Sequence, residues 1–187
     1  MVIMPNWCTD QVVFTSSNLD NLLNLERDLD DALRLINEGD ETWIGRLLRY
    51  KGEDVGKFYC RGFIYYASDK EEVEETEQFT LNVNSAWVPI LEVYDWIAEQ
   101  YDLEYVLAAE EPGCDIYINT DVTGEIFSQR YLVYHEDLGE RCFSTVDEII
   151  NAFQTINIPA KAGMTLEELE QLDDDIFIRR YKESVDF

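Results

Sequence analysis

The spacing of apolar residues changes repeatedly along this chain, and that change is the strongest constraint on its fold. Asp10 to Thr15 (DQVVFT) is a short β-branched and aromatic run, which is typical of a strand. Apolar residues from Leu19 to Ile36 then recur at intervals of three and four. This spacing predicts an amphipathic helix with a Ser or Asn cap and a stop at Gly39. The chain therefore combines helices and strands.

Segments with strand-like alternation and segments with helical spacing follow one another up to residue 153. Phe79, Leu81 and Val83 alternate with polar neighbours, so we expect them to face the helices while Thr80 and Asn82 face outward. Further strands are expected at 58–66, 103–109, 116–118 and 131–135, and further helices at 43–48, 90–98 and from Thr145. The order β-α-α-β-β-α-β-β-β-α favours an α+β fold, one antiparallel sheet covered on one face by helices.

The C-terminal part differs from the rest in pattern. Pro159 to Gly163 (PAKAG) is typical of a linker, and Thr165 begins a second capping box ahead of a leucine-rich segment. We therefore predict an α+β domain over residues 1–158 and a linker with a helical tail over 159–187. The tail either packs back on the domain or serves as a docking element.

Charge sets the chain apart from an ordinary domain. Forty acidic side chains face fourteen basic ones, a formal net charge of -26 over 187 residues. Because uncompensated carboxylates repel one another and weaken a compact state, the excess points to solubility, exclusion of nucleic acid or a cationic partner. Aromatic residues make up 13% of the chain, which is too many for a disordered acidic polypeptide. We therefore expect the charged side chains to lie on the surface of a domain with a packed core.

Cysteine usage and the lack of a long apolar run limit the other classes. The four cysteines show no C-x-x-C pair, and His135 is the one histidine, so we expect reduced, buried thiols and no tightly bound transition metal. No cofactor motif is present. No charged start followed by an apolar stretch appears, and no run approaches the length of a membrane span. We expect a cytoplasmic protein.

Four local strings, in a fixed order, carry a resemblance. They are Met4-Pro5-Asn6-Trp7-Cys8, Cys60-Arg61-Gly62, Ser85-Ala86-Trp87-x-Pro89 and Glu110-Glu111-Pro112-Gly113-Cys114. With these strings the chain resembles the YubB-type ferredoxin-like proteins of phages, plasmids and other mobile elements, from residue 4 to about 153. The resemblance implies a ferredoxin-like sheet and an accessory role. It implies no catalytic residues, and fold alone gives no function.

Glu110, Glu111 and Asp115 form the sharpest polar cluster, on either side of a Pro-Gly turn. Paired carboxylates can act as general acid and base or bind a hard cation. Adjacent strand residues point to opposite faces, so Glu110 and Glu111 converge only if a turn or bulge re-aims one of them. The alternative is a charged strand end with no chemistry.

Two other constellations have a functional and a structural interpretation. Trp7 and Trp87 could stack bases, but the net charge opposes nucleotides, so we expect core or rim aromatics and no direct binding of nucleic acid. A Cys142–His135 pair could form across a turn at Gly139, although nothing marks it as a nucleophile with its base.

The sequence thus favours a non-enzymatic accessory protein that binds a protein with a basic surface. A rigid field of carboxylates could occupy a DNA-binding groove, as a DNA mimic. The alternatives are carboxylate chemistry near Glu110 and a structural role through dimerisation; the oligomeric state stays open. Reversing Glu71, Glu72, Glu74 and Glu75 to Lys should weaken binding and leave the fold intact. The expected partner-binding residues are Glu71, Glu72, Glu74, Glu75, Glu110, Glu111 and Asp115.

Overall fold

The chain forms two compact units, each with its own sheet. The computed structural model describes residues 6–37 and 39–184. Unit 1 ends at Ile116 and unit 2 begins at Tyr117. The sequence prediction placed a boundary after residue 158, whereas the structure groups residues 159–184 with 117–158 in unit 2. The expected α+β class is confirmed.

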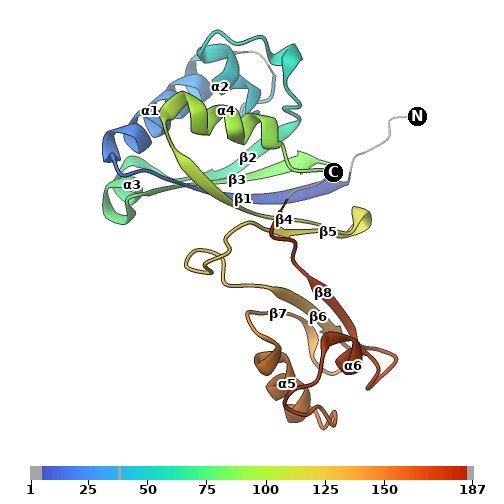
Figure 1. Cartoon of the computed structure of the whole chain (residues 1–187). Helices are drawn as coiled ribbons and strands as arrows, with labels where there is room; N and C mark the ends of the chain where they lie inside the picture. Colours follow the sequence, from blue (N-terminus) through green and yellow to red (C-terminus); the bar gives the residue numbers. More distant parts are fainter. Residues whose placement is uncertain (1–5, 38, 185–187) are drawn as a thin grey trace, which may run out of the picture. The chain divides into compact units, whose positions relative to one another are not determined.

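Unit 1 is an antiparallel sheet with helices on one face (Figure 1). Its strands are β1 (Trp7–Thr15), β2 (Gly62–Ala67), β3 (Gln78–Ala86), β4 (Glu104–Glu111) and β5 (Ile116–Asn119), which crosses the boundary between the units. Its helices are α1 (Leu19–Leu35), α2 (Gly45–Tyr50), α3 (Lys70–Thr76) and α4 (Leu91–Tyr101), with 3-10 turns at Val55–Lys57 and Pro112–Cys114. The strand order is β2-β3-β1-β4-β5.

The predicted register of β3 is confirmed. Phe79, Leu81 and Val83 are buried, whereas Thr80 and Asn82 are half-buried on the opposite face. β3 pairs with β1 in antiparallel register, with Leu81 opposite Val12. Because residues opposite one another share a face, the apolar sides of β1 and β3 form one surface for the helices.

The first predicted helix is also present, with a different end. Asn18 caps α1 and accepts a hydrogen bond from the Asp20 amide, in agreement with the expected Ser or Asn cap. The helix ends at Leu35, before the stop expected at Gly39. The strand expected over 58–66 begins only at Gly62, because the 3-10 turn at Val55–Lys57 precedes it and the Tyr59 amide donates to Glu92.

The acidic connection between β2 and β3 contains a helix that the sequence analysis missed. β2 and β3 pair as antiparallel neighbours, as a hairpin requires. Between them α3 begins with a capping box in which the Asp69 side chain accepts from the Glu72 amide and the Glu72 side chain accepts from the Asp69 amide. It ends at Thr76, and the left-handed φ of 54° at the following residue, Glu77, turns the chain into β3.

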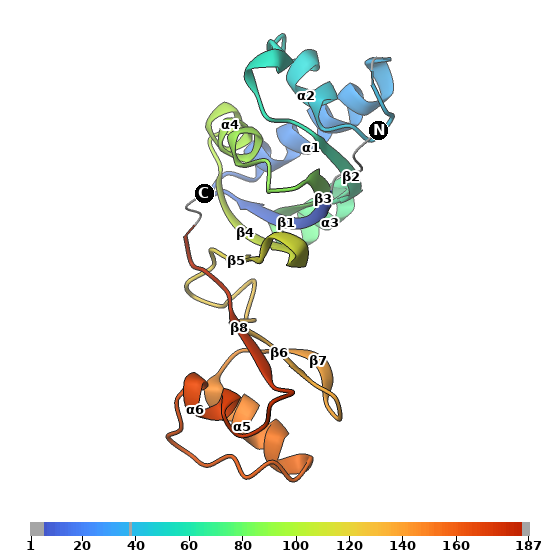
Figure 2. The same cartoon turned by 90° about the vertical axis from the view of Figure 1, so that its right-hand side faces the viewer.

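Unit 2 packs two helices on one side of a three-stranded sheet (Figure 2). Its strands are β6 (Tyr131–His135), β7 (Gly139–Phe143) and β8 (Phe177–Arg180), in the order β7-β6-β8. Its core is formed by buried side chains from both layers, among them Val133, Ile149, Phe153, Leu169 and Ile178. Its helices are α5 (Val146–Thr155) and α6 (Leu166–Glu170).

The C-terminal segment is not the helical tail that the sequence predicted. Among residues 159–184, only Leu166–Glu170 is α-helical, and Phe177–Arg180 pairs with β6 as a strand. The segment Asp173 to Asp175 ends the helical pattern, and Ile176 and Ile178 then alternate into the core. Of the two alternatives for this segment, packing back is the one observed. No helix in the described ranges combines the length and apolar character that a membrane crossing needs.

Candidate functional site

The predicted acidic residues fall into two groups at opposite ends of the sheet in unit 1. Gln78, which follows α3, pairs with Thr15 at one end of β1. Glu110 pairs with Thr9 near the other end. Thr9 and Thr15 are six positions apart along β1, a distance of about 20 Å. The expectation of one partner-binding set is therefore corrected: Glu71, Glu72, Glu74 and Glu75 lie apart from Glu110, Glu111 and Asp115.

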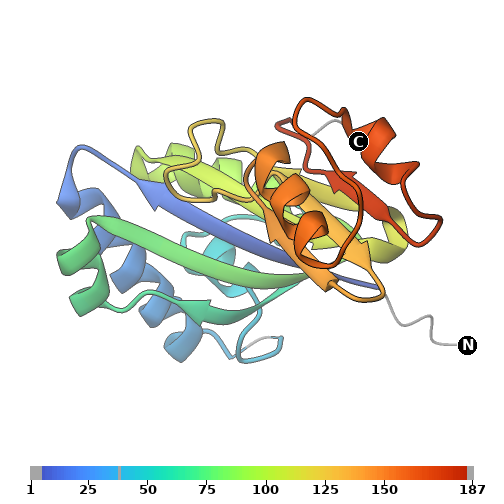
Figure 3. The same cartoon turned by 90° about the horizontal axis from the view of Figure 1, so that it is seen from below.

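The first group belongs to a surface formed by α1 and α3, which pack against each other (Figure 3). Burial raises the pKa of the Glu26 carboxyl on α1, and the nearby carboxylates of Asp30 and Asp69 raise it further. Lys70 and Arg27 lie near Glu26 as well and oppose this shift, so the surface is predominantly, but not purely, acidic. We call this the acidic α1–α3 surface, and it comprises Glu26, Asp30, Asp69, Glu71, Glu74 and Glu75.

Glu72 has a structural role that separates it from its neighbours. Its carboxylate accepts hydrogen bonds from the Asp69 amide at 3.2 Å and from the Tyr66 hydroxyl at 2.7 Å. By contrast, Glu71 and Glu75 are exposed, and Glu74 makes an exposed ion pair with Lys70 at 3.4 Å. Such a pair contributes little to stability. The carboxylates of Glu71, Glu74 and Glu75 therefore face solvent.

The second group does not converge. Glu111 is only 4% exposed, and its Oε1 accepts from the Gly113 amide at 3.1 Å. Glu110 points to the opposite face, beside a shallow hollow of about 210 Å³ lined by Thr9, Gln11 and Ala108. Asp115 is exposed at the end of the Pro112–Cys114 turn. The alternation argued from the sequence holds, so Glu110 and Glu111 cannot share a substrate or a cation.

A buried polar cluster beside Glu111 escaped the sequence analysis. Asp10 is fully buried in β1 and accepts hydrogen bonds from Ser85 Oγ at 3.0 Å and from the Tyr94 hydroxyl at 2.6 Å. Cys8 lies two residues away on the same face and is also fully buried. The signal was the alternation itself, because Asp10 shares the core-facing parity of Val12 and Phe14.

The environment of this cluster favours neutral side chains. Burial raises the pKa of the Asp10 carboxyl to about 6, although hydrogen bonds from Tyr94, Cys8, Ser85 and the Ile90 amide oppose the shift. Burial and the Asp10 carboxylate likewise raise the pKa of the Cys8 thiol and of the Tyr94 hydroxyl. A thiol of raised pKa is a poor nucleophile, so the cluster does not resemble an activated cysteine site.

The four strings that carry the family resemblance gather around this cluster. Cys8 and Gly62 both pair with Ser85, and the Trp87 amide donates to the Asn6 carbonyl at 2.9 Å. A Cβ atom on Gly113 would lie 2.5 Å from Asn6 Nδ2. We call this part of unit 1 the motif end. Met4 and Pro5 lie outside the described residues. The strings contribute Asn6 to Cys8, Cys60 to Gly62, Ser85 to Pro89 and Glu110 to Cys114.

Trp7, one of the two tryptophans considered for base stacking, and two basic residues make contacts within unit 1. Trp7 is 46% exposed and its ring packs edge-on against Phe63, with centroids 5.7 Å apart. Arg46 is buried and donates to the carbonyls of Leu33 and Gly39. Lys51 pairs with Asp28 at 2.9 Å. Arg46 and Lys51 therefore both bind groups of the protein itself.

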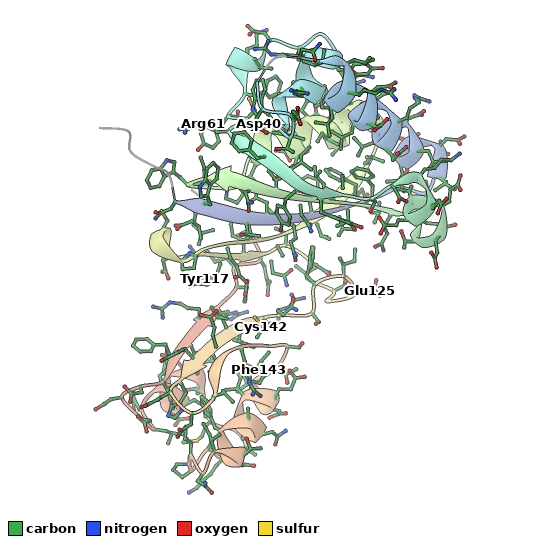
Figure 4. All side chains as sticks on the ribbon, turned by 180° about the vertical axis from the view of Figure 1, so that it is seen from behind. Asp40, Arg61, Tyr117, Glu125, Cys142 and Phe143 are labelled. Atoms are coloured by element: carbon green, nitrogen blue, oxygen red, sulfur yellow. The ribbon has the colours of Figure 1, made fainter. Side chains whose placement is uncertain are left out.

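His135 and Cys142 do not form a catalytic pair. In the β6–β7 ladder His135 lies opposite Gly139 and Cys142 lies opposite Leu132, so their side chains occupy opposite faces of the sheet. Cys142 is labelled in Figure 4 on the outer strand β7, and its Sγ lies 3.7 Å from the Tyr181 hydroxyl. His135 Nδ1 accepts from the Asp137 amide.

Comparisons add no relative to this description. No family model, curated protein or solved structure matches the chain. Within residues 6–37 and 39–184, no three His, Cys, Asp or Glu side chains are grouped to hold a metal ion. The interpretation of function therefore depends on the two ends of unit 1, the acidic α1–α3 surface and the buried cluster of the motif end.

Proposed function

We propose that this protein is a non-enzymatic accessory protein that binds a protein partner with a basic surface through the acidic α1–α3 surface. The observation that carries the proposal is the packing of α1 against α3, which brings carboxylates of both segments onto one surface, with Arg27 and Lys70 among them. The attraction of a cationic partner to such a surface is the sum of the contributions of its charges. This attraction raises the association rate more than it raises the strength of any single contact.

We further propose that unit 1 is a ferredoxin-like domain of the YubB type, from a phage or another mobile element. Two features support this assignment. With α2 and α3 as additions, the elements from β1 to β4 follow the order β-α-β-β-α-β, and their strand order is β2-β3-β1-β4. The four strings that carry the resemblance also lie together at one end of the sheet.

The partner class we propose is a cytoplasmic DNA-binding or DNA-cutting protein. Duplex DNA presents one charge for about every 1.7 Å of its axis, and its ligands meet it with Lys and Arg. The α1–α3 surface offers carboxylates on rigid elements, since α3 is fixed by its capping box and by the turn at Glu77. A preorganised surface loses little entropy on binding. The protein would therefore act as a DNA mimic that blocks the partner's basic groove.

A charge reversal on α3 tests this proposal. The double variant Glu74→Lys/Glu75→Lys changes two solvent-facing carboxylates and leaves the capping residues intact. Partners are captured on the purified protein from a lysate of its host cells at low ionic strength and identified by mass spectrometry. Association rates with the purified partner are then measured against salt. We expect the variant to associate roughly tenfold more slowly at low salt, and duplex DNA to compete with the original protein.

The control is a reversal of equal charge elsewhere. Glu136 and Glu140 are exposed in unit 2, so Glu136→Lys/Glu140→Lys alters the net charge by the same amount at another place. The control should bind nearly as fast as the original. If both doubles slow association equally, total charge and not the α1–α3 surface drives binding. If neither does, this surface serves solubility alone.

A further inference from the structure

The sheet of unit 2 has one face that α5 and α6 leave uncovered (Figure 2). Val133 and Ile178 belong to the core that the sheet forms with the helices. Successive residues of a strand point to opposite sides, so the neighbouring residues Tyr134 and Phe177 point to the uncovered side. Tyr134 is 46% exposed and Phe177 is 53% exposed. We call this side of the sheet the open face, and it comprises Leu132, Tyr134, Glu140, Cys142, Phe177 and Arg179.

The two exposed aromatic residues are direct neighbours across two strands. Tyr134 on β6 pairs with Phe177 on β8 in the antiparallel ladder. The Cβ atoms of such a pair lie about 4.5–5.5 Å apart, so the two rings form one continuous apolar patch. Single apolar residues on a surface need no explanation, whereas contiguous exposed apolar groups mark contact surfaces. The open face is therefore a candidate contact surface.

The charged residues of the open face lie at two of its corners. Within β6, β7 and β8, only Glu140 and Arg179 carry charge on this face. Glu140 lies opposite Tyr134 on one side, and Arg179 lies opposite Leu132 on the other. The two corners are diagonally opposed, with Cα atoms about 12 Å apart by the spacings of an antiparallel sheet. One acid and one base thus flank the aromatic pair.

We propose that the open face is self-complementary and that two copies of the chain form a dimer through it. A two-fold axis in the plane of the contact, perpendicular to the line from Glu140 to Arg179, exchanges these two positions. Each Glu140 then faces Arg179 of the second copy, so the ion pair forms twice. The same rotation brings the four rings of Tyr134 and Phe177 together beside the axis. The strands of the two sheets cross steeply, close to the orthogonal packing of sheets.

Charge favours a second copy over other occupants of the open face. Nucleic acid requires a positive surface, but Glu140 balances Arg179 here, in a chain of net charge -26. The other two arginines of these strands do not change this balance, because they point to the side of the helices. Arg141 lies opposite Val133, and Arg180 lies opposite Tyr131. A second copy presents an opposite charge to both corners at once.

The size of the open face sets the strength that we expect. Its three strands have four or five residues each, which gives less area than the roughly 800 Å² per partner of a standard interface. Two copies of net charge -26 also repel each other, and salt screens this repulsion. We therefore expect a weak dimer, with a dissociation constant of roughly tens of micromolar or more at about 0.3 M salt. At low ionic strength the copies stay separate, so the partner experiments on the acidic α1–α3 surface are independent of this proposal.

Sedimentation equilibrium of the whole protein, over about 5–500 µM at about 0.3 M salt, tests the proposal. We expect the average mass to rise with concentration towards twice that of one chain. Phe177→Ser should weaken self-association at least about tenfold, because the lost ring counts twice in a two-fold contact. The control is Leu35→Ser, which removes an apolar side chain that is 57% exposed in unit 1. This control should leave self-association unchanged.

An exchange of charges tests the pairing itself. Arg179→Glu places two acids together at each end of the contact, and Glu140→Arg places two bases there, so each should weaken the dimer about tenfold. The two variants shift the net charge in opposite directions, and general repulsion therefore cannot explain a loss in both. Glu140→Arg/Arg179→Glu restores opposite charges and should recover most of the association. A protein that stays monomeric at every concentration, a dimer that Phe177→Ser leaves unchanged, or a double variant as weak as the single ones overturns the proposal.

Discussion

The Tyr94 hydroxyl donates to Asp10 Oδ2 at 2.6 Å, and neither side chain is exposed to solvent. The bond joins the first strand of unit 1 to its fourth helix, across 84 positions of the chain. Hydrogen bonds to an ionised acceptor are about twice as strong as neutral ones. The same contact thus helps to position α4 over the sheet and limits the cost of a buried carboxyl.

Removal of this hydroxyl should destabilise unit 1 in a pH-dependent way. Tyr94→Phe removes one of the donors to the buried Asp10 carboxyl, at a cost of about 1–3 kcal/mol. The loss should be greater at pH 7.5 than at pH 5, because Asp10, with its pKa raised by burial to about 6, is ionised at the higher value. Urea unfolding followed by tryptophan fluorescence measures it.

The matched control is Tyr50→Phe. The Tyr50 hydroxyl lies 3.4 Å from Asp31 Oδ2, and Tyr50, the last residue of α2, is only half-buried. Loss of this hydroxyl should change the free energy of unfolding little at either pH. If the two variants lose equal free energy of unfolding, the burial of Asp10 does not increase the cost of removing a hydroxyl donor.

Asp121 should show the opposite dependence on pH. Burial alone would raise its pKa, but hydrogen bonds from Thr123 and the amides of Phe127, Ile126 and Gly124 hold it well below its usual value. The stabilisation is therefore present above the ordinary pKa of a free aspartate and is lost as pH falls below it. Asp121→Asn should cost about 1.5–3 kcal/mol at neutral pH and much less near pH 2.

Acid unfolding of unit 2 measures this difference, with Asp137→Asn as the control. Asp137 is exposed in the same unit, so its loss should leave the acid transition unchanged. A parallel shift of both variants would contradict a specific role for the Asp121 carboxylate. The residues that Asp121 organises form the loop from Asp121 to Arg130, whose side chain donates to the carbonyls of Asp121, Phe127 and Gln129.

Gly62 should tolerate no side chain. A Cβ atom at this position would lie 2.7 Å from Val83 Cγ1 and 2.8 Å from Ile90 Cδ1, both of them in the core. Gly62→Ala should therefore lower the stability of unit 1 by about 1–3 kcal/mol, which thermal unfolding will show. Gly56→Ala is the control, because its Cβ would meet only the side chain of exposed Asp54. An unchanged Tm for Gly62→Ala would mean that α4 shifts at no cost.

Elements whose apolar pattern continues over many residues could be predicted from the sequence, and short elements could not. The helix from Leu19 and the alternation from Phe79 to Val83 each bury a continuous face, so their type and orientation followed from spacing. α3 has one buried residue, Val73, and is specified by its caps. In the C-terminal segment a leucine pattern suggested a helix, but pairing with β6 decides the state of Phe177–Arg180.

The candidate site was harder to predict because its members meet only in three dimensions. Cys8 shares a strand face with Asp10, but Ser85 and Tyr94 come from β3 and α4, and no local spacing connects these two with Asp10. The prediction of a single set of acidic binding residues was wrong for a related reason. The charge of a residue does not indicate which end of a sheet the residue occupies. The argument from alternation for Glu110 and Glu111 succeeded because it used a local geometric rule.

Charge reversal within α3 should have opposite effects on stability at the two ends of the helix. Glu71 and Glu72 lie in the first turn, where they favour the helix and where Glu72 completes the capping box; Glu74 and Glu75 lie toward the last turn, which holds no basic residue. Because positive charge is favourable at a helix C-terminus and unfavourable at its N-terminus, Glu74→Lys/Glu75→Lys should raise the Tm by a few degrees, and Glu71→Lys/Glu72→Lys should lower it by a similar amount.

Both doubles change the net charge equally, so relief of general repulsion cannot account for a difference in sign. Thermal unfolding at low and high salt separates the contributions. The gain of Glu74→Lys/Glu75→Lys should shrink with salt, because it is electrostatic. The loss in Glu71→Lys/Glu72→Lys should persist in part, because the hydrogen bonds from the Asp69 amide and the Tyr66 hydroxyl to Glu72 are gone. If both doubles raise the Tm alike, repulsion across the acidic α1–α3 surface outweighs the capping of α3.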